Sequence, residues 1–120
     1  MPNQALLELV NKYRPRGVAL MDELLLSAED ALRLCDELEA LNVPISGVNL
    51  WYYAQARDQQ ILAQDHQELS MSDAVLQGEN PVSESVAMAK HFIAFLRPPR
   101  TAFVSLAVDE PEWVMGEDEG

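Results

Sequence analysis

Positive charge is scarce in this sequence: eight Lys and Arg residues stand against twenty Asp and Glu, which gives a formal net charge of −12. Proteins that bind the phosphate backbone of nucleic acids use a basic surface, so this composition argues against nucleic-acid binding. An anionic membrane surface would repel the chain for the same reason. A basic protein partner would be attracted and steered towards it, although strong negative charge also serves solubility alone.

Cysteine and histidine are scarce as well, with one Cys and two His in the chain. Cys35 has no partner for an internal disulfide, and its place among apolar residues predicts a buried structural thiol. His91 is expected at the surface of a helix. His66 stands near Asp65 and Glu68, as in a metal site or an acid–base cluster, but no second His or Cys is close to it in the sequence. We therefore expect no metal and no cofactor.

Sequence motifs for catalysis are missing too, since the chain contains no GxxxxGK[ST], GxGxxG, GxSxG or HExxH. Adjacent acids such as Asp22 and Glu23 occur, but with twenty acidic residues such pairs arise easily. A glycosidase-like site needs two acids that face each other across a cleft, and adjacency does not provide this. The sequence predicts a protein that is not an enzyme, with an enzyme of unknown class as the least supported alternative.

Long apolar runs are absent, and none approaches the roughly 20 residues that cross a bilayer. In residues 1–17 the charges follow a short apolar run, whereas a secretory signal has its charges first. We therefore expect a cytoplasmic protein. A chain of 120 residues predicts one compact domain, over residues 1–110, followed by an acidic tail over 111–120 that either frays or docks through Trp113.

Apolar periodicity and capping residues outline the secondary structure. Ser27 begins a Ser-x-x-Asp capping pattern, apolar residues then recur at three- and four-residue spacing, and Asn42 ends the helix. The predicted helices cover residues 3–13, 28–41 and 83–96. The predicted strands cover the later half of 18–26, then 43–53 and 101–108, while 57–80 is predicted as a loop with a short strand at 61–62. This order predicts an α+β fold, a small mixed sheet with helices packed mainly on one face.

The most aromatic stretch is VPISGVNLWYY, residues 43–53. Alternation along a strand assigns Tyr52 to the core face, and it assigns the following residues to the opposite face: Asn49, Trp51 and Tyr53. The predicted loop then adds three acids: Asp58, Asp65 and Glu68. Trp and Tyr are frequent anchors of protein interfaces, and acids around them suit a basic partner, so these six residues form the predicted binding site. The alternative is that the two outward rings pack beneath a loop or helix.

The run LLLSAEDALRLCDELEALNVPISGVNLWYY also resembles the bacterial polymorphic-toxin immunity proteins, most nearly the group called immunity protein 40. The later SESVAMAKHFIAFL helix and TAFVSLAVD strand fit the same layout, so the resemblance covers residues 20–109. Asn49 stands where the family often has an acid. The resemblance implies stoichiometric binding and neutralisation of a cognate toxin, without naming the toxin.

These observations leave two functions open besides an enzyme. The first is an immunity protein, and analogy at the level of class suggests a basic, nuclease-type toxin as its partner. The second is an acidic interaction or structural domain unrelated to toxins. Nothing in the sequence fixes the oligomeric state.

Overall fold

The computed structural model describes residues 4–20, 23–57, 60–94 and 102–110 together with Trp113. Its helices in chain order are α1 (Gln4–Tyr13), the 3-10 helix η1 (Arg14–Arg16), α2 (Ala28–Ala40), α3 (Asp73–Leu76) and α4 (Pro81–Ala94). Its strands are β1 (Val18–Leu20), β2 (Glu23–Leu25), β3 (Gly47–Arg57), β4 (Gln60–Ser70) and β5 (Ala102–Ala107).

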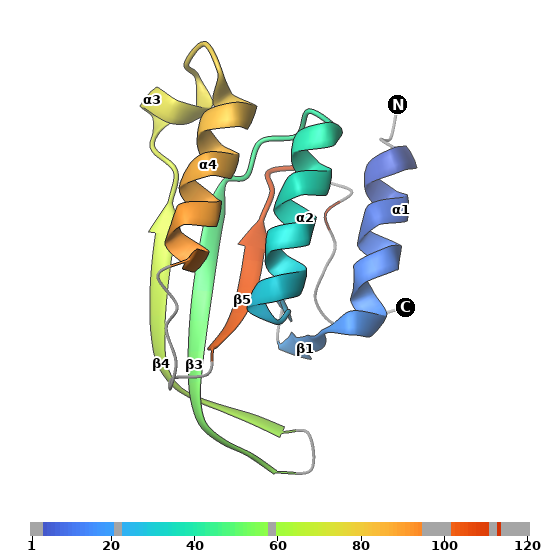
Figure 1. Cartoon of the computed structure of the whole chain (residues 1–120), viewed down its shortest axis with the longest axis vertical. Helices are drawn as coiled ribbons and strands as arrows, with labels where there is room; N and C mark the ends of the chain where they lie inside the picture. Colours follow the sequence, from blue (N-terminus) through green and yellow to red (C-terminus); the bar gives the residue numbers. More distant parts are fainter. Residues whose placement is uncertain (1–3, 21–22, 58–59, 95–101, 111–112, 114–120) are drawn as a thin grey trace.

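The main sheet has the strand order β4-β3-β5, and both neighbouring pairs are antiparallel. Leu26, directly after β2, exchanges two backbone hydrogen bonds of 2.8 Å with Val104, so the β1–β2 hairpin continues the sheet beside β5. Helices α2 and α4 cover one face of this sheet, and α1 lies beside α2 (Figure 1). The predicted α+β fold with helices on one face is confirmed. The described strands pair only antiparallel, however, and do not form the mixed sheet that we expected.

The expectation for residues 57–80 was wrong. The segment predicted as a loop contains β4, an eleven-residue strand that pairs with β3, and the short helix α3. The short strand expected at residues 61–62 is the beginning of β4. A strand at the edge of a sheet can carry polar side chains on much of its surface, so β4 lacks the apolar alternation by which a half-buried strand is recognised.

The other differences concern where elements begin and end. The hairpin strand β1 was not predicted, and β3 begins at Gly47 rather than at residue 43. Helix α4 covers Pro81–Ala94 instead of 83–96, with residues 95–96 outside the described part of the chain. Helix α1 agrees with its predicted range to within one residue.

Both ends of α2 are fixed by local hydrogen bonds, as its sequence predicts. The Ser27 Oγ accepts from the Asp30 N–H at 3.1 Å, which caps the first turn. At the other end Asn42 has a φ of 61°, in the left-handed region that Asn tolerates better than most residues. The Asn42 N–H then donates to the Glu39 carbonyl and the Val43 N–H to the Leu38 carbonyl, so α2 stops before the turn into β3.

The core lies between the helices and the sheet. Helix α2 turns its apolar stripe to the sheet, and its fully buried members are Ala31, Leu34, Cys35 and Leu38. Burial, followed by the neighbouring Asp36, raises the pKa of the Cys35 thiol to about 12, so the thiol stays protonated in the core. This agrees with the structural role expected for this cysteine.

Helix α1 is held against α2 by Glu37, which offers a pH-dependent test of the packing. Lys12 Nζ lies 2.5 Å from one Glu37 carboxylate oxygen, and the hydroxyl of buried Tyr13 donates to the other. Burial by itself raises the Glu37 pKa, but these two hydrogen bonds outweigh it and hold the pKa below its ordinary value of 4.5.

Because the folded-state pKa of Glu37 is depressed, its ionised form adds stability that is present above about pH 4.5 and is lost as the pH falls through the lower folded pKa. We expect Glu37→Gln to lower the free energy of unfolding at neutral pH. The gap between the variant and the natural chain should shrink on acidification, as measured by urea unfolding at each pH. A gap that stays constant with pH would contradict this account.

Trp113 docks on the domain. Its indole Nε1–H donates to the Leu106 carbonyl at 3.0 Å, and the ring packs against the core. This carbonyl lies on the side of β5 that faces β2, so the indole covers that strand edge. Of the two behaviours considered for the tail, docking is confirmed at this residue, and the remainder of 111–120 lies outside the described residues.

Candidate functional site

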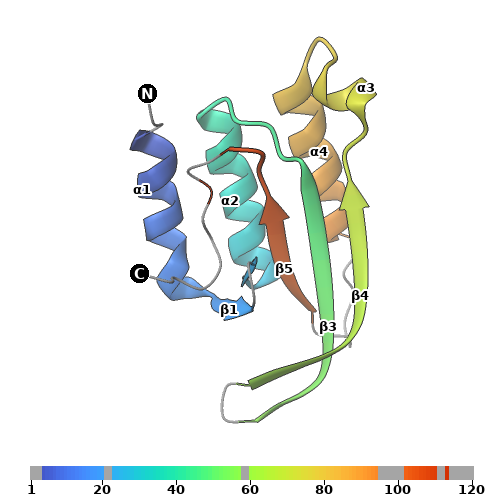
Figure 2. The ribbon, with the colours of Figure 1, turned by 180° about the vertical axis from the view of Figure 1, so that it is seen from behind.

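One face of the sheet carries no helix. Seen from behind, β4, β3 and β5 lie in front of α2 and α4, and no described helix covers them (Figure 2). The described residues on this helix-free face are Gly47, Asn49, Trp51, Glu68, Ser70, Phe103, Ser105 and Ala107. Alternation from the buried residues Val48 and Leu50, together with the register of the neighbouring strands, places them there. The sequence predicted this side for Asn49 and Trp51, whereas Glu68 and Ser70 were predicted in a loop.

The start of β3 is fixed by a buried serine on α4. The Ser85 Oγ accepts from the Ile45 N–H at 3.0 Å and donates to the Val82 carbonyl at 3.3 Å. Both Ser85 and Ile45 are fully buried, so this bond holds the chain in place two residues before β3 begins. The core therefore sets the position from which Asn49 and Trp51 project on the helix-free face.

Exposure differs between positions of the helix-free face. One row of neighbouring positions crosses the sheet from Leu25 through Ser105 and Asn49 to Glu68. Leu25 is 1 % exposed and Ser105 4 % exposed, whereas Asn49 is half-buried and Glu68 is exposed. In this row the accessible positions are those of β3 and β4, and in β5 Ala107 is exposed and Phe103 half-buried.

The structure brings three of the six predicted site residues together. Asn49 and Glu68 are direct partners in the β3–β4 register, and Trp51 follows two residues along β3 on the same face. Trp51 is half-buried, and neither α2 nor α4 lies on its side of the sheet. Glu68 was predicted in a loop, and its position in β4 is what places its side chain beside Asn49.

Of the other three predicted residues, the structure describes only the backbone of Tyr53 and Asp65. Tyr53 lies in β3 opposite Ala63, and Asp65 lies in β4 opposite Tyr52, with a register shift between Tyr52 and Tyr53. The side chains of these residues lie outside the described part of the structure, as does Asp58 altogether. The backbone register therefore puts Asp65 opposite Tyr52 rather than opposite Trp51, whose partner is position 66.

Sequence reasoning missed Phe103, the residue opposite Trp51 in β5. The two aromatic residues are register partners, and both are half-buried. Cross-strand aromatic pairs stabilise a sheet and form a continuous apolar surface. The alternation of TAFVSLAV did assign Phe103 to the less buried side of β5, but only the pairing of β5 with β3 places it beside Trp51.

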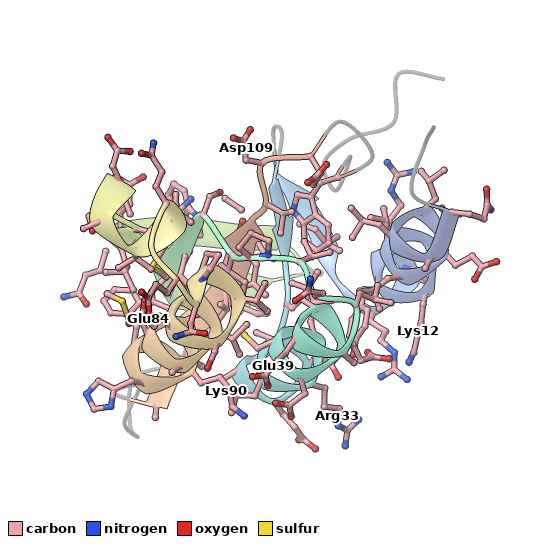
Figure 3. All side chains as sticks on the ribbon, turned by 90° about the horizontal axis from the view of Figure 1, so that it is seen from above. Lys12, Arg33, Glu39, Glu84, Lys90 and Asp109 are labelled. Carbon is pink, nitrogen blue, oxygen red and sulfur yellow. The ribbon has the colours of Figure 1, made fainter. Side chains whose placement is uncertain are left out.

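The charges are distributed unequally between the two sides of the molecule. Four basic side chains of the helix layer are paired with acids, as Lys12–Glu37, Arg16–Asp30, Arg33–Glu29 and Lys90–Asp36. Figure 3 shows Arg33 and Lys90 on the helix side and Asp109 on the sheet side. Among the described side chains of β3, β4 and β5 there is no Lys or Arg. The four basic side chains thus lie among acids of the helix layer, and Glu68 faces solvent on the opposite side.

Grooves also lie between the helices of the helix layer. The groove between α1 and α2 has a volume of about 320 Å³ and a floor that includes Leu9 and Leu41. The groove between α2 and α4 has a volume of about 560 Å³ and a lining that includes Leu32, Val86 and the exposed His91. Both run between packed helices, where grooves between side-chain ridges are expected.

Neither a metal-binding cluster nor a membrane-spanning helix occurs among the described residues. No three His, Cys, Asp or Glu side chains of that part of the chain lie close enough together to hold a metal ion. None of the helices it contains is long and apolar enough to cross a membrane.

No protein-family model, curated protein or solved structure matches this chain. Its function therefore has to be inferred from its own surface, and the accessible part of the helix-free face combines a half-buried Trp, a polar Asn and an exposed acid.

Proposed function

We propose that this protein is an immunity protein, which binds a cognate bacterial toxin in the cytoplasm and neutralises it stoichiometrically, without catalysis. The observation that carries the proposal is Trp51, a half-buried aromatic on the helix-free face beside Asn49 and Glu68. Large aromatic side chains with few rotatable bonds bury much area at low entropic cost, and they dominate the energetics of protein interfaces.

Charge supports a basic partner. The net charge of −12 attracts a basic protein over long distances, and Glu68 adds an exposed acid on the helix-free face. An acidic surface of this kind can occupy a site that otherwise holds phosphates, so a nuclease is the toxin class that fits best. The resemblance of residues 20–109 to immunity protein 40 points to the same role.

The test uses the product of the gene directly upstream, because an immunity protein is encoded next to its toxin. Co-expression should relieve the toxicity of that product, and the two chains should elute as one complex. Protection should saturate at equimolar protein, since each bound molecule blocks one toxin molecule. Protection at far lower ratios would indicate catalytic inactivation and contradict the proposal. A complex with a harmless protein would favour the alternative, an interaction domain unrelated to toxins.

Neutralising the predicted acids should slow association with this partner. The change is the triple variant Asp58→Asn, Asp65→Asn and Glu68→Gln. Loss of three negative charges near the interface should reduce the association rate constant by roughly tenfold at low salt, with a much smaller effect on dissociation. Stopped-flow mixing at two salt concentrations measures this, and the difference should largely vanish near 0.5 M salt, where the Debye length is only about 4 Å.

A matched control removes the same net charge from the other side of the molecule. Glu39, Glu79 and Glu84 are exposed acids of α2, of the turn before α4 and of α4, and Glu39 and Glu84 are labelled in Figure 3. Changing all three to Gln should slow association clearly less than the triple variant of the predicted acids. Equal slowing by both variants would mean that net charge alone steers the partner, without a preferred face.

A further inference from the structure

The sheet ends at β4, and this edge differs from the opposite one. Beyond β5 the backbone is engaged by Leu26, through two hydrogen bonds with Val104, and by the Trp113 indole. Beyond β4 no described strand continues the sheet. Figures 1 and 2 show β4 at the outer side of the sheet from both directions, with no described element beside its outer edge.

The direction of each backbone group follows from the bonds beyond β5. In an antiparallel sheet, a residue whose N–H and C=O both point to one neighbouring strand alternates with residues whose groups point to the other. Val104 uses both its backbone N–H and its C=O to bond Leu26, so these two groups are directed away from β3. The backbone N–H and C=O of Ser105 are then directed towards β3, and those of its register partner Asn49 are directed towards β5.

The same alternation continues to β4. The backbone N–H and C=O of Val48, next to Asn49, are directed towards β4. Those of its register partner Leu69 are directed towards β3. The neighbours of Leu69 therefore direct their N–H and C=O groups away from the sheet. We call these backbone groups, of His66, Glu68 and Ser70, the outer edge of β4.

The outer edge of β4 lacks most of the features that keep strand edges from pairing. Natural edges are commonly protected by proline, lysine, bulges or a covering element. The stretch DHQELS, residues 65–70, contains no Pro and no Lys, and the register shifts of the hairpin lie beyond it, after Tyr52. The stretch carries two acids, Asp65 and Glu68, which repel an acidic strand and attract a basic one.

We propose that the outer edge of β4 accepts an extended, basic segment of the protein partner as an additional strand. This inference rests on the proposed function, because it assigns the binding mode of the same partner. A second copy of the chain is disfavoured as the occupant, since two molecules of net charge −12 repel each other and self-pairing brings the acidic stretch against itself. An added strand also lies beside Glu68 and Ser70, two exposed positions of the helix-free face.

The test needs no toxin. The probe is a short, blocked peptide that alternates lysine and valine, titrated against the full chain while amide hydrogen exchange is followed by NMR. The amides of Glu68 and Ser70 should become protected, because they donate to the added strand. A peptide that alternates glutamate and valine should give no protection, and neither should the lysine–valine peptide with all its backbone nitrogens methylated, which has no free strand edge on either side.

A proline variant isolates the backbone group. Ser70→Pro removes an outward N–H, and it leaves the inward bonds of Leu69 to β3 and all the charges in place. It should weaken binding of the lysine–valine peptide by about tenfold, whereas Ser70→Ala, which keeps the N–H, should change it by less than about twofold. Urea unfolding of both variants establishes that each is folded.

Three results would overturn the inference: protection that appears elsewhere than at the outer edge of β4, equal binding by Ser70→Pro and Ser70→Ala, or reciprocal protection of this edge in a dimer of the chain alone. Exchange in the unaltered chain keeps the inference testable even if the proline variant does not fold. Because the peptide contains no toxin, failure here leaves the proposed function standing, and failure of toxin binding leaves this measurement unchanged.

Discussion

Replacing Leu38 by Ala should lower the free energy of unfolding by about 2–5 kcal/mol, because it removes buried methyl groups and leaves a cavity. Leu38 is fully buried on the face of α2 that packs on the sheet. Its carbonyl also accepts the hydrogen bond from Val43 that ends the helix, and the substitution leaves this bond unchanged. Urea unfolding followed by circular dichroism gives the difference directly.

The control for this prediction is the next residue of the same helix. Glu39 is exposed, so Glu39→Ala keeps helix propensity and removes no buried contact. It should change stability by less than about 0.5 kcal/mol. If Leu38→Ala were equally mild, α2 would not present this side to the core, and the arrangement of helices on the sheet would be wrong.

Replacing Trp51 by Ala should weaken binding of the partner by about 2 kcal/mol or more, which is roughly 30-fold in Kd. The loss should appear mainly as faster dissociation, because truncation of an interface anchor leaves the diffusional encounter almost unchanged. Surface plasmon resonance with the immobilised toxin separates the two rate constants. Trp51→Phe should retain much of the affinity, since a planar ring remains on the helix-free face.

The control for Trp51 is Met88, a large apolar residue that is 38 % exposed on α4. Met88→Ala also removes exposed apolar surface, but from the helix layer, on the other side of the sheet from Trp51. It should leave both rate constants nearly unchanged. A larger effect of Met88→Ala than of Trp51→Ala would move the binding surface to the helices.

Local signals in the sequence explain why α2 was predicted closely. Ser27 at the start, Asn42 at the end and the apolar stripe between them each act over a few residues, so no tertiary information is needed. The same holds for β5, whose alternation identified Val104 as the buried side. Elements of this kind can be predicted from one sequence because every local preference agrees with the fold.

The strand β4 could not be recognised in the same way. Its sequence QILAQDHQELS is mostly polar after the first four residues, and polar runs of this kind are typical of loops. Pairing with β3 on one side is what makes it a strand, and such pairing is a long-range contact that no local pattern encodes.

The candidate site also combines features that a local pattern predicts with features that depend on strand pairing. The face of Asn49 and Trp51 came from alternation within one strand, which the sequence displays. The proximity of Glu68 and Phe103 came from the register of two neighbouring strands, which it does not display. Of the three acids predicted around the aromatic anchor, Glu68 lies beside Asn49 and Asp65 pairs with Tyr52 rather than Trp51, while Asp58 lies outside the described residues.

The most direct test of the central claim compares folding and binding in the same Trp51→Ala sample. The account predicts that the variant unfolds cooperatively with most of its stability retained, because the ring lies on the helix-free face and outside the core, while its affinity for the toxin falls roughly 30-fold. The opposite result would be a collapse of stability with normal toxin binding by the fraction that remains folded. That result would make Trp51 a structural residue and remove the proposed site.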